Sequence, residues 1–168
     1  MSASKIKPEL IHLIAIRVLK SHLEVSDKLM DKPRKIDGFK MGLSSESGFN
    51  FDEKLMRFRL GLKLFGHDKS EKPIGIEGEY AIEFKYHIEN MDDFVTKKDD
   101  HGKYLVSDDL GGTIISISYS TARGIILERT QGTDFNGIIL PVINPKKLLV
   151  IESDNISANP EVKEAIKS

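Results

Sequence analysis

Residues that commonly carry catalysis or bind metals are scattered along this sequence. Histidine occurs at positions 12, 22, 67, 87 and 101, and no two of these positions have the spacing of a helical zinc motif. Cysteine is absent, so disulfides, thiolate metal ligands and thiol nucleophiles are excluded. We therefore predict that the chain has no metal site, and we interpret His22 and His87 as solvated side chains on a sheet face.

Two short segments have some of the composition of catalytic or phosphate-binding motifs without their spacing. Leu110-Gly111-Gly112-Thr113 lacks the lysine of a phosphate-binding loop, and the serine-rich run at 116–120 lacks the glycines that flank a nucleophilic serine. No acid, base and nucleophile can be assigned together. These observations predict a protein that is not an enzyme and needs no cofactor.

Composition and charge bear on several further classes. The 168 residues have a net charge of -1, which argues against nucleic acid as a partner. The apolar stretch near the N-terminus spans only about ten residues and has no small-residue cleavage site, so we predict neither a signal peptide nor a membrane span. The absence of cysteine suits a reducing compartment, and we expect a cytoplasmic protein. The length fits one domain, residues 1–168.

Two segments, 55–65 and 74–88, alternate apolar and polar residues as half-buried strands do. A polar connection with a glycine and a proline separates them, which predicts an antiparallel hairpin. Another strand is expected at 11–25, where apolar residues fall on both faces, as is typical of a strand that is central or covered on both sides. The polar side of the 74–88 strand carries an outward acidic row that includes Glu77, Glu79 and Glu83.

A long helix is predicted after these strands. Asp108 or Asp109 can cap its start, isoleucines at helical spacing give it an apolar face, and Gly132 offers a C-terminal stop. Small residues in the same stretch would let another backbone approach closely; they include Ser116, Ser120, Ala122 and Gly124. Two interpretations remain open, contact with a symmetry-related subunit and packing on the helix's own sheet.

The segments around this helix are expected to complete the fold. Phe135 to Ile143 indicates a fourth strand, at a sheet edge because Gly137 and Pro141 interrupt it. Asparagine followed by proline at 144–145 and again at 159–160 predicts two short helices, the second within a C-terminal extension at 151–168. The core would then span about residues 10–150.

The segment 26–50 is too long and polar for a tight turn, and we interpret it as a loop that folds back over the domain. It carries apolar side chains that a plain loop does not need, namely Phe39, Met41, Leu43 and Phe49. Either these residues cap the core, or they line an apolar binding groove together with Leu148 and Leu149.

A series of short motifs runs through the second half of the chain: Ala122-Arg123, Phe135, Leu140-Pro141-Val142-Ile143-Asn144 and Leu148-Leu149. This series resembles the SecB family of export chaperones, in which an Ala-Arg pair in the long helix is followed by Phe, a short apolar strand, Pro-Val-Asn and an apolar pair. The resemblance covers about residues 10–150. The sequence departs from the family at Thr121, where an aromatic residue is usual, at Pro145, and at a chain end without the long acidic tail.

The resemblance implies an α+β fold, a four-stranded antiparallel sheet with a long helix on one face and short C-terminal helices. It further implies a dimer of dimers that holds unfolded polypeptides in apolar grooves without ATP. Its clients would be secretory preproteins or one dedicated antitoxin, and the acidic row would dock the translocation ATPase SecA. In this reading the small-residue stretch is an interface between subunits. A carrier with an apolar small-ligand pocket between sheet and helix is the alternative that the strand pattern also fits.

Overall fold

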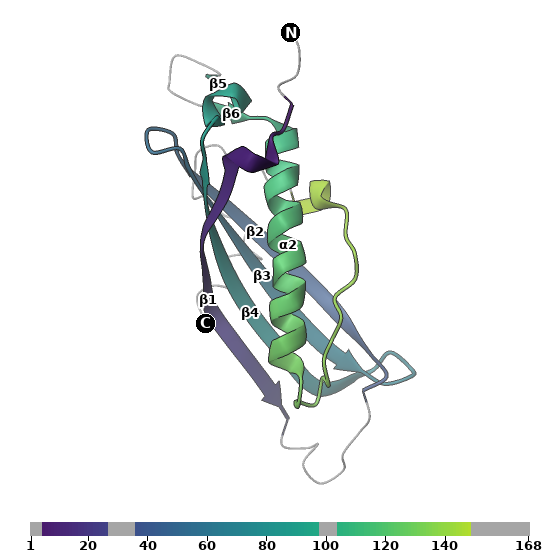
Figure 1. Ribbon diagram of the computed structural model, residues 1–168. Helices are drawn as coiled ribbons and strands as arrows, with labels where there is room; N and C mark the ends of the chain where they lie inside the picture. Colours follow the sequence, from purple (N-terminus) through teal and green to yellow (C-terminus); the bar gives the residue numbers. More distant parts are fainter. Residues whose placement is uncertain (1–4, 27–35, 98–103, 149–168) are drawn as a thin grey trace.

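The computed structural model describes residues 5–26, 36–97 and 104–148, which form one sheet and a long helix (Figure 1). The main strands form a four-stranded antiparallel sheet in the order β1-β4-β3-β2, and α2 lies across one face of it. A small β5-β6 hairpin lies near the start of α2. In chain order, the elements are η1 (Pro8–Leu10), β1 (Ile11–Val25), β2 (Gly38–Asn50), β3 (Leu55–His67), β4 (Pro73–Ile88), η2 (Met91–Phe94), β5 (Val95–Lys97), β6 (Tyr104–Val106), α2 (Asp108–Thr130) and η3 (Pro145–Leu148).

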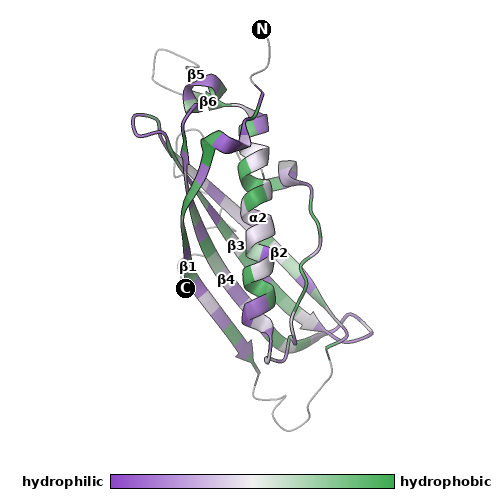
Figure 2. Ribbon diagram, viewed as in Figure 1, coloured by the Kyte–Doolittle hydropathy of each residue, from purple (hydrophilic) through white to green (hydrophobic). Residues whose placement is uncertain are grey.

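The core lies between α2 and the two central strands. Burial alternates strictly along both strands, so one face of each is buried and apolar and the other is mostly polar (Figure 2). Each large apolar side chain removed from water in this way contributes about 1.5 to 3 kcal/mol. The buried residues of the strands are those that the alternation predicts: Met56, Phe58, Leu60, Leu62 and Leu64 on β3, and Ile74, Ile76, Tyr80, Ile82, Phe84, Tyr86 and Ile88 on β4.

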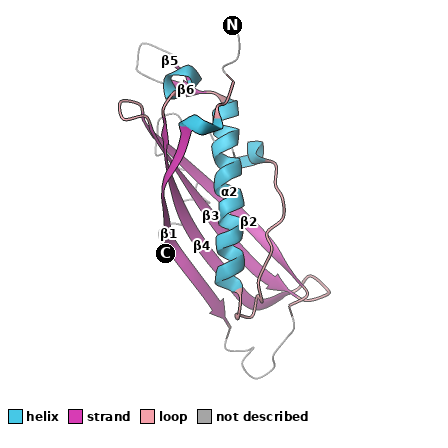
Figure 3. Cartoon of the chain, viewed as in Figure 1, coloured by secondary structure: helices cyan, strands magenta, loops and turns pink. Residues whose placement is uncertain are grey.

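The fourth strand of the sheet is not the segment that the sequence predicts. Gly38–Asn50 forms β2 and pairs with β3, whereas residues 135–144, here called the strap, contain no strand and run back beside α2 (Figure 3). Side chains of α2 satisfy strap backbone groups: Tyr119 and Arg123 donate to the carbonyls of Pro141 and Leu140, and the Thr130 hydroxyl accepts from the amide of Ile138. The strap is therefore bound to the helix and is not part of the sheet.

The ends of the long helix agree with the sequence to within a few residues. Ser107, one residue before the predicted caps, accepts a hydrogen bond from the amide of Leu110 at 3.3 Å, and α2 ends at Thr130. Of the two predicted C-terminal helices, the first is only the single 3-10 turn η3, and the second lies outside the described residues.

One buried hydrogen bond joins the helix to the sheet. The hydroxyls of Tyr86 and Ser118 lie 2.8 Å apart, and both side chains are fully buried. Burial raises the pKa of Tyr86 above its usual 10.0, and the hydrogen bond with Ser118 opposes this with a smaller effect.

This raised pKa predicts a loss of stability at alkaline pH. The unfolded chain releases the Tyr86 proton near pH 10, while the folded chain keeps it to a higher pH. The free energy of unfolding should therefore be unaffected by this group below about pH 10 and should fall as pH rises through the folded pKa. Urea unfolding between about pH 8 and pH 11 measures the effect, and Tyr86→Phe should show a shallower alkaline decline. Equal declines in the two proteins would contradict the assignment to Tyr86.

Candidate functional site

The strap, α2 and β2 meet at the side chain of Tyr119. Its hydroxyl donates to the Pro141 carbonyl at 2.8 Å and lies 4.0 Å from the Met41 sulfur on β2. Arg123, one turn further along α2, donates to the Leu140 carbonyl at 2.9 Å. These contacts hold the strap in an extended path beside the helix, above the β2 side of the sheet.

The strap turns alternate apolar side chains to the core and to solvent. Ile138 and Leu140 are buried, whereas Ile139 is 68% exposed and Val142 is 82% exposed. We call Ile139 and Val142 the strap surface. Sequence reasoning assigned this segment to an edge strand and did not single out these two residues. A signal was present, because apolar residues fill almost every position from 138 to 143 and a segment on the outside of a sheet cannot bury them all.

The apolar residues of β2 lie on the same side of the sheet as α2. Phe39, Met41, Leu43 and Phe49 are each partly buried and pack against the core. Next to them, the Ser45 hydroxyl donates to the Leu148 carbonyl at 2.8 Å, and Leu148 itself is buried. Leu149 lies outside the described residues. The structure thus brings five of the six predicted groove residues to one face, on a strand and a 3-10 turn instead of a loop and a helix.

A pocket of about 150 Å³ lies between α2 and the strap, and its lining includes Ile115, Tyr119, Val142 and Ile143. Sites for small molecules usually measure about 300 to 1,000 Å³. The pocket therefore gives the small-ligand carrier hypothesis no support.

The four small residues of α2 predicted to form an interface divide between two sides of the helix: Ser116, Ser120 and Gly124 follow one another at four-residue spacing, whereas Ala122 faces the core. Ser116 and Ser120 line the pocket beside the strap. Ala122 is buried in the protomer's own core at 1% exposure, while a Cβ atom at Gly124 would meet nothing within 4 Å. Ala122 therefore serves packing within the chain, whereas Ser120 and Gly124 are exposed.

A different surface exposes apolar side chains. β1 lies at the edge of the sheet, which corrects the prediction that it is central or covered on both sides. We call its exposed aliphatic residues the β1 row; they are Leu13, Ile14, Ile16 and Leu19, with exposures of 38%, 51%, 42% and 48%. Long apolar edges of this kind are sites of association with other chains.

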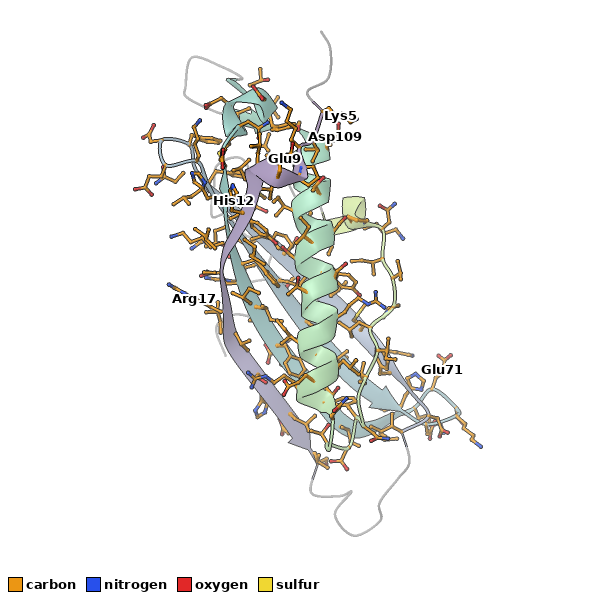
Figure 4. The ribbon with its side chains drawn as sticks, viewed as in Figure 1. Lys5, Glu9, His12, Arg17, Glu71 and Asp109 are labelled. Carbon is orange, nitrogen blue, oxygen red and sulfur yellow. The ribbon has the colours of Figure 1, made fainter. Side chains whose placement is uncertain are left out.

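The acidic row lies on the face of the sheet opposite α2, where basic residues from neighbouring strands compensate most of its charge. Glu79 lies 2.6 Å from Lys20, and Glu83 lies 3.1 Å from Arg59 and 3.9 Å from Arg17, which projects away from the helix (Figure 4). Within the described part of the chain, Glu77 is the member of the row without an ion pair. The face is therefore mixed in charge and not uniformly acidic.

Other chemistry in the described residues is limited. Burial raises the pKa of three tyrosines, Tyr80, Tyr86 and Tyr119. In residues 5–26, 36–97 and 104–148, no three histidine or acidic side chains gather as ligands for a metal ion. None of the helices in these ranges is long and apolar enough to cross a membrane.

Comparison with solved structures gives a match to a Mycobacterium tuberculosis SecB-like chaperone in complex with a peptide from the HigA1 antitoxin. The TM-score is 0.50 at 11% sequence identity, over 81% of this chain and 92% of the other. This chain has the SecB-like fold. The sheet and long helix that the resemblance implied are thereby confirmed.

A second solved structure matches this chain less closely. It is a Streptococcus agalactiae protein of unknown function, with a TM-score of 0.41 and 12% identity over 79% of this chain and 97% of the other. No protein-family model matches the sequence, and no curated protein matches it.

Proposed function

We propose that this chain is a chaperone that holds apolar segments of unfolded polypeptides without ATP and without catalysing a reaction. The observation that carries the proposal is the strap surface, where Ile139 and Val142 stand exposed on a segment that Tyr119 links to Met41 on β2. A further support is the SecB-like fold, because the similar mycobacterial chaperone has a peptide bound.

The site suits weak, unspecific binding. Each large aliphatic group that a client covers contributes about 1.5 to 3 kcal/mol before the cost of ordering the client. A few such contacts hold a segment in the micromolar range and release it readily, which is what a chaperone without an energy source requires. Secretory preproteins and a single antitoxin are both clients of this chemical kind.

The direct test is suppression of aggregation. A reduced, denatured client such as α-lactalbumin is diluted into buffer with increasing amounts of this protein and no nucleotide, and turbidity is followed together with particle size. We expect turbidity to fall and a soluble complex to form near stoichiometric ratios. Unchanged aggregation at a tenfold excess of this protein would overturn the proposed function.

We further propose that the protein is a cytoplasmic homo-oligomer, a dimer of dimers, in which the β1 row is a contact surface. Four exposed aliphatic residues lie between positions 13 and 19 of one edge strand, two of them at its register shifts, and such a concentration favours a partner that buries them. Docking of SecA on the opposite sheet face would then depend chiefly on Glu77, since Glu79 and Glu83 are engaged in ion pairs.

Disruption of the β1 row tests the oligomer. Ile16→Lys places a charge within the row, where lysine on an exposed edge strand is well tolerated by the fold. We expect light scattering at micromolar concentration to give a smaller particle than the wild type, with little change in circular dichroism. Phe65→Lys is the matched control, because Phe65 is comparably exposed on β3 but lies outside the row. A wild-type monomer, or equal effects of both variants, would contradict the assignment.

A further inference from the structure

β2 has an outer edge that no other strand of the described sheet pairs with. β2 pairs with β3 over its full length, Gly38 to Asn50, without a register shift, and it stands at the end of the strand order. In an antiparallel strand, alternate residues direct their amide and carbonyl groups away from the paired neighbour. β2 therefore presents a regular row of hydrogen-bonding groups on its outer side.

Two devices that commonly protect an edge strand, proline and a bulge, are missing from β2. The strand contains no proline and no bulge, whereas the other edge strand, β1, has two register shifts. Three glycines and three serines among its 13 residues keep it narrow enough for another backbone to approach.

The charged side chains of β2 are directed away from the open edge. Lys40 lies 3.4 Å from Glu71 in the β3-β4 turn, and Glu46 lies 3.1 Å from Arg57 and 3.5 Å from Arg59 on β3. Both charges are thus paired on the inner side of the strand, so they put little repulsion in the path of an incoming chain.

The two faces beside this edge differ in polarity. On the helix side, Phe39, Met41 and Leu43 are partly exposed, while Lys40 and Gly42 lie on the opposite face. Met41 lies 4.0 Å from the Tyr119 hydroxyl that binds the strap. A strand added next to β2 would bury alternate side chains against the apolar row and leave the others in water. At Ser45, η3 covers the helix side through the hydrogen bond to Leu148. The accessible half is therefore Gly38 to Ser44.

We propose that clients bind by strand addition, as an extended segment of about six or seven residues that alternates apolar and polar side chains and pairs with β2 along Gly38–Ser44. The inference rests on the proposed function and assigns its binding mode. Backbone hydrogen bonds supply affinity without sequence specificity, and the helix-side row selects the alternation. A proline-rich or helical segment would not fit this edge.

Backbone methylation of a probe peptide tests the pairing. The probe is a fluorescent nine-residue peptide in which isoleucine alternates with serine, with lysine at both ends for solubility. In an added strand, every second amide of the peptide faces β2. Methylation of the amides that face β2 should weaken binding at least tenfold, while methylation of the amides that face away should change the affinity less than twofold. Equal effects of the two sets, with intact holdase activity, would overturn strand addition and leave the proposed function standing. Absence of both peptide binding and aggregation suppression would overturn both.

Disulfide trapping gives an independent readout, because the natural sequence has no cysteine. Gly42→Cys lies on the polar face, where a Cβ atom is only 3.9 Å from that of Lys63, and Leu43→Cys is its neighbour on the helix side. Strand addition predicts that Gly42→Cys traps a probe with cysteine at a serine position and Leu43→Cys traps one with cysteine at an isoleucine position. The rate of disulfide formation in each of these two matched pairs should be at least tenfold higher than when the probes are exchanged between the variants. Trapping at Leu43→Cys alone would indicate a peptide that lies on the helix side without pairing, and would overturn the proposal.

Discussion

Replacement of Ala122 by arginine is expected to abolish folding of the domain. Ala122 is 1% exposed and belongs to the core cluster between α2 and the sheet. An unpaired charge forced into such a place costs about 3 to 5 kcal/mol, and the overpacking adds about 1 to 3 kcal/mol. Their sum is comparable with the whole free energy of unfolding of a typical domain, about 5 to 15 kcal/mol. Circular dichroism and thermal melting of Ala122→Arg measure the loss directly.

Gly124→Arg is the matched control on the same helix. Nothing lies within 4 Å of a Cβ atom at this position, and arginine is a better helix former than glycine by about 0.5 to 1 kcal/mol. The protomer should therefore stay folded with an equal or slightly higher melting temperature. Dissociation of the oligomer in this variant alone would move the contact surface from the β1 row to the helix. A well-folded Ala122→Arg protein would contradict the burial on which the first prediction depends.

The pair Ala122 and Gly124 illustrates what the sequence can and cannot predict. A row of small residues on a helix indicates close approach of some other backbone or side chain, but it does not say whether the neighbour belongs to the same chain. Here α2 packs Ala122 on its own sheet and leaves Gly124 open, so residues that look alike in sequence have different surroundings.

The central hairpin could be predicted because its pattern has no interruption. β3 and β4 bury every second residue along their length, and the polar connection between them fixes their pairing. The edge strands lack this clarity. In β1 the register shifts insert Ile14 and Leu19, which moves apolar residues onto both faces and imitates a strand that is covered on both sides.

β2 and the strap exchanged their predicted roles for a related reason. Serine occupies positions 45 and 47 on the helix side of β2, where apolar residues would be expected, so the strand resembles a polar loop. The strap is rich in aliphatic residues and resembles a strand, yet its carbonyls are bound by Tyr119 and Arg123 from α2. Side chains more than ten residues away decide its structure, and local sequence does not reveal such partners.

Replacement of both strap-surface residues, Ile139 and Val142, by serine is expected to weaken client capture at least tenfold. The protein should stay as stable as the wild type. Ile139 and Val142 are 68% and 82% exposed, so substitution should change the free energy of unfolding by no more than about 0.5 kcal/mol. Loss of two aliphatic contacts removes about 3 kcal/mol or more of gross binding energy, and about 1.4 kcal/mol already corresponds to tenfold in affinity. The measurement is fluorescence anisotropy of an unfolded client fragment with the Ile139→Ser, Val142→Ser double variant.

Leu140→Ser on the same strap provides the opposite control. Leu140 is fully buried, so its truncation should cost about 2 to 5 kcal/mol of stability. Its effect on client affinity per folded molecule should be small, because the side chain faces the core and not the client. Phe65→Ser, which removes an exposed apolar group on the far side of the sheet, should affect neither quantity strongly.

If the double variant captured clients as well as the wild type does, the strap surface would not be the binding site. The apolar contact would then have to be sought on the β1 row, where exposed aliphatic side chains also lie close together.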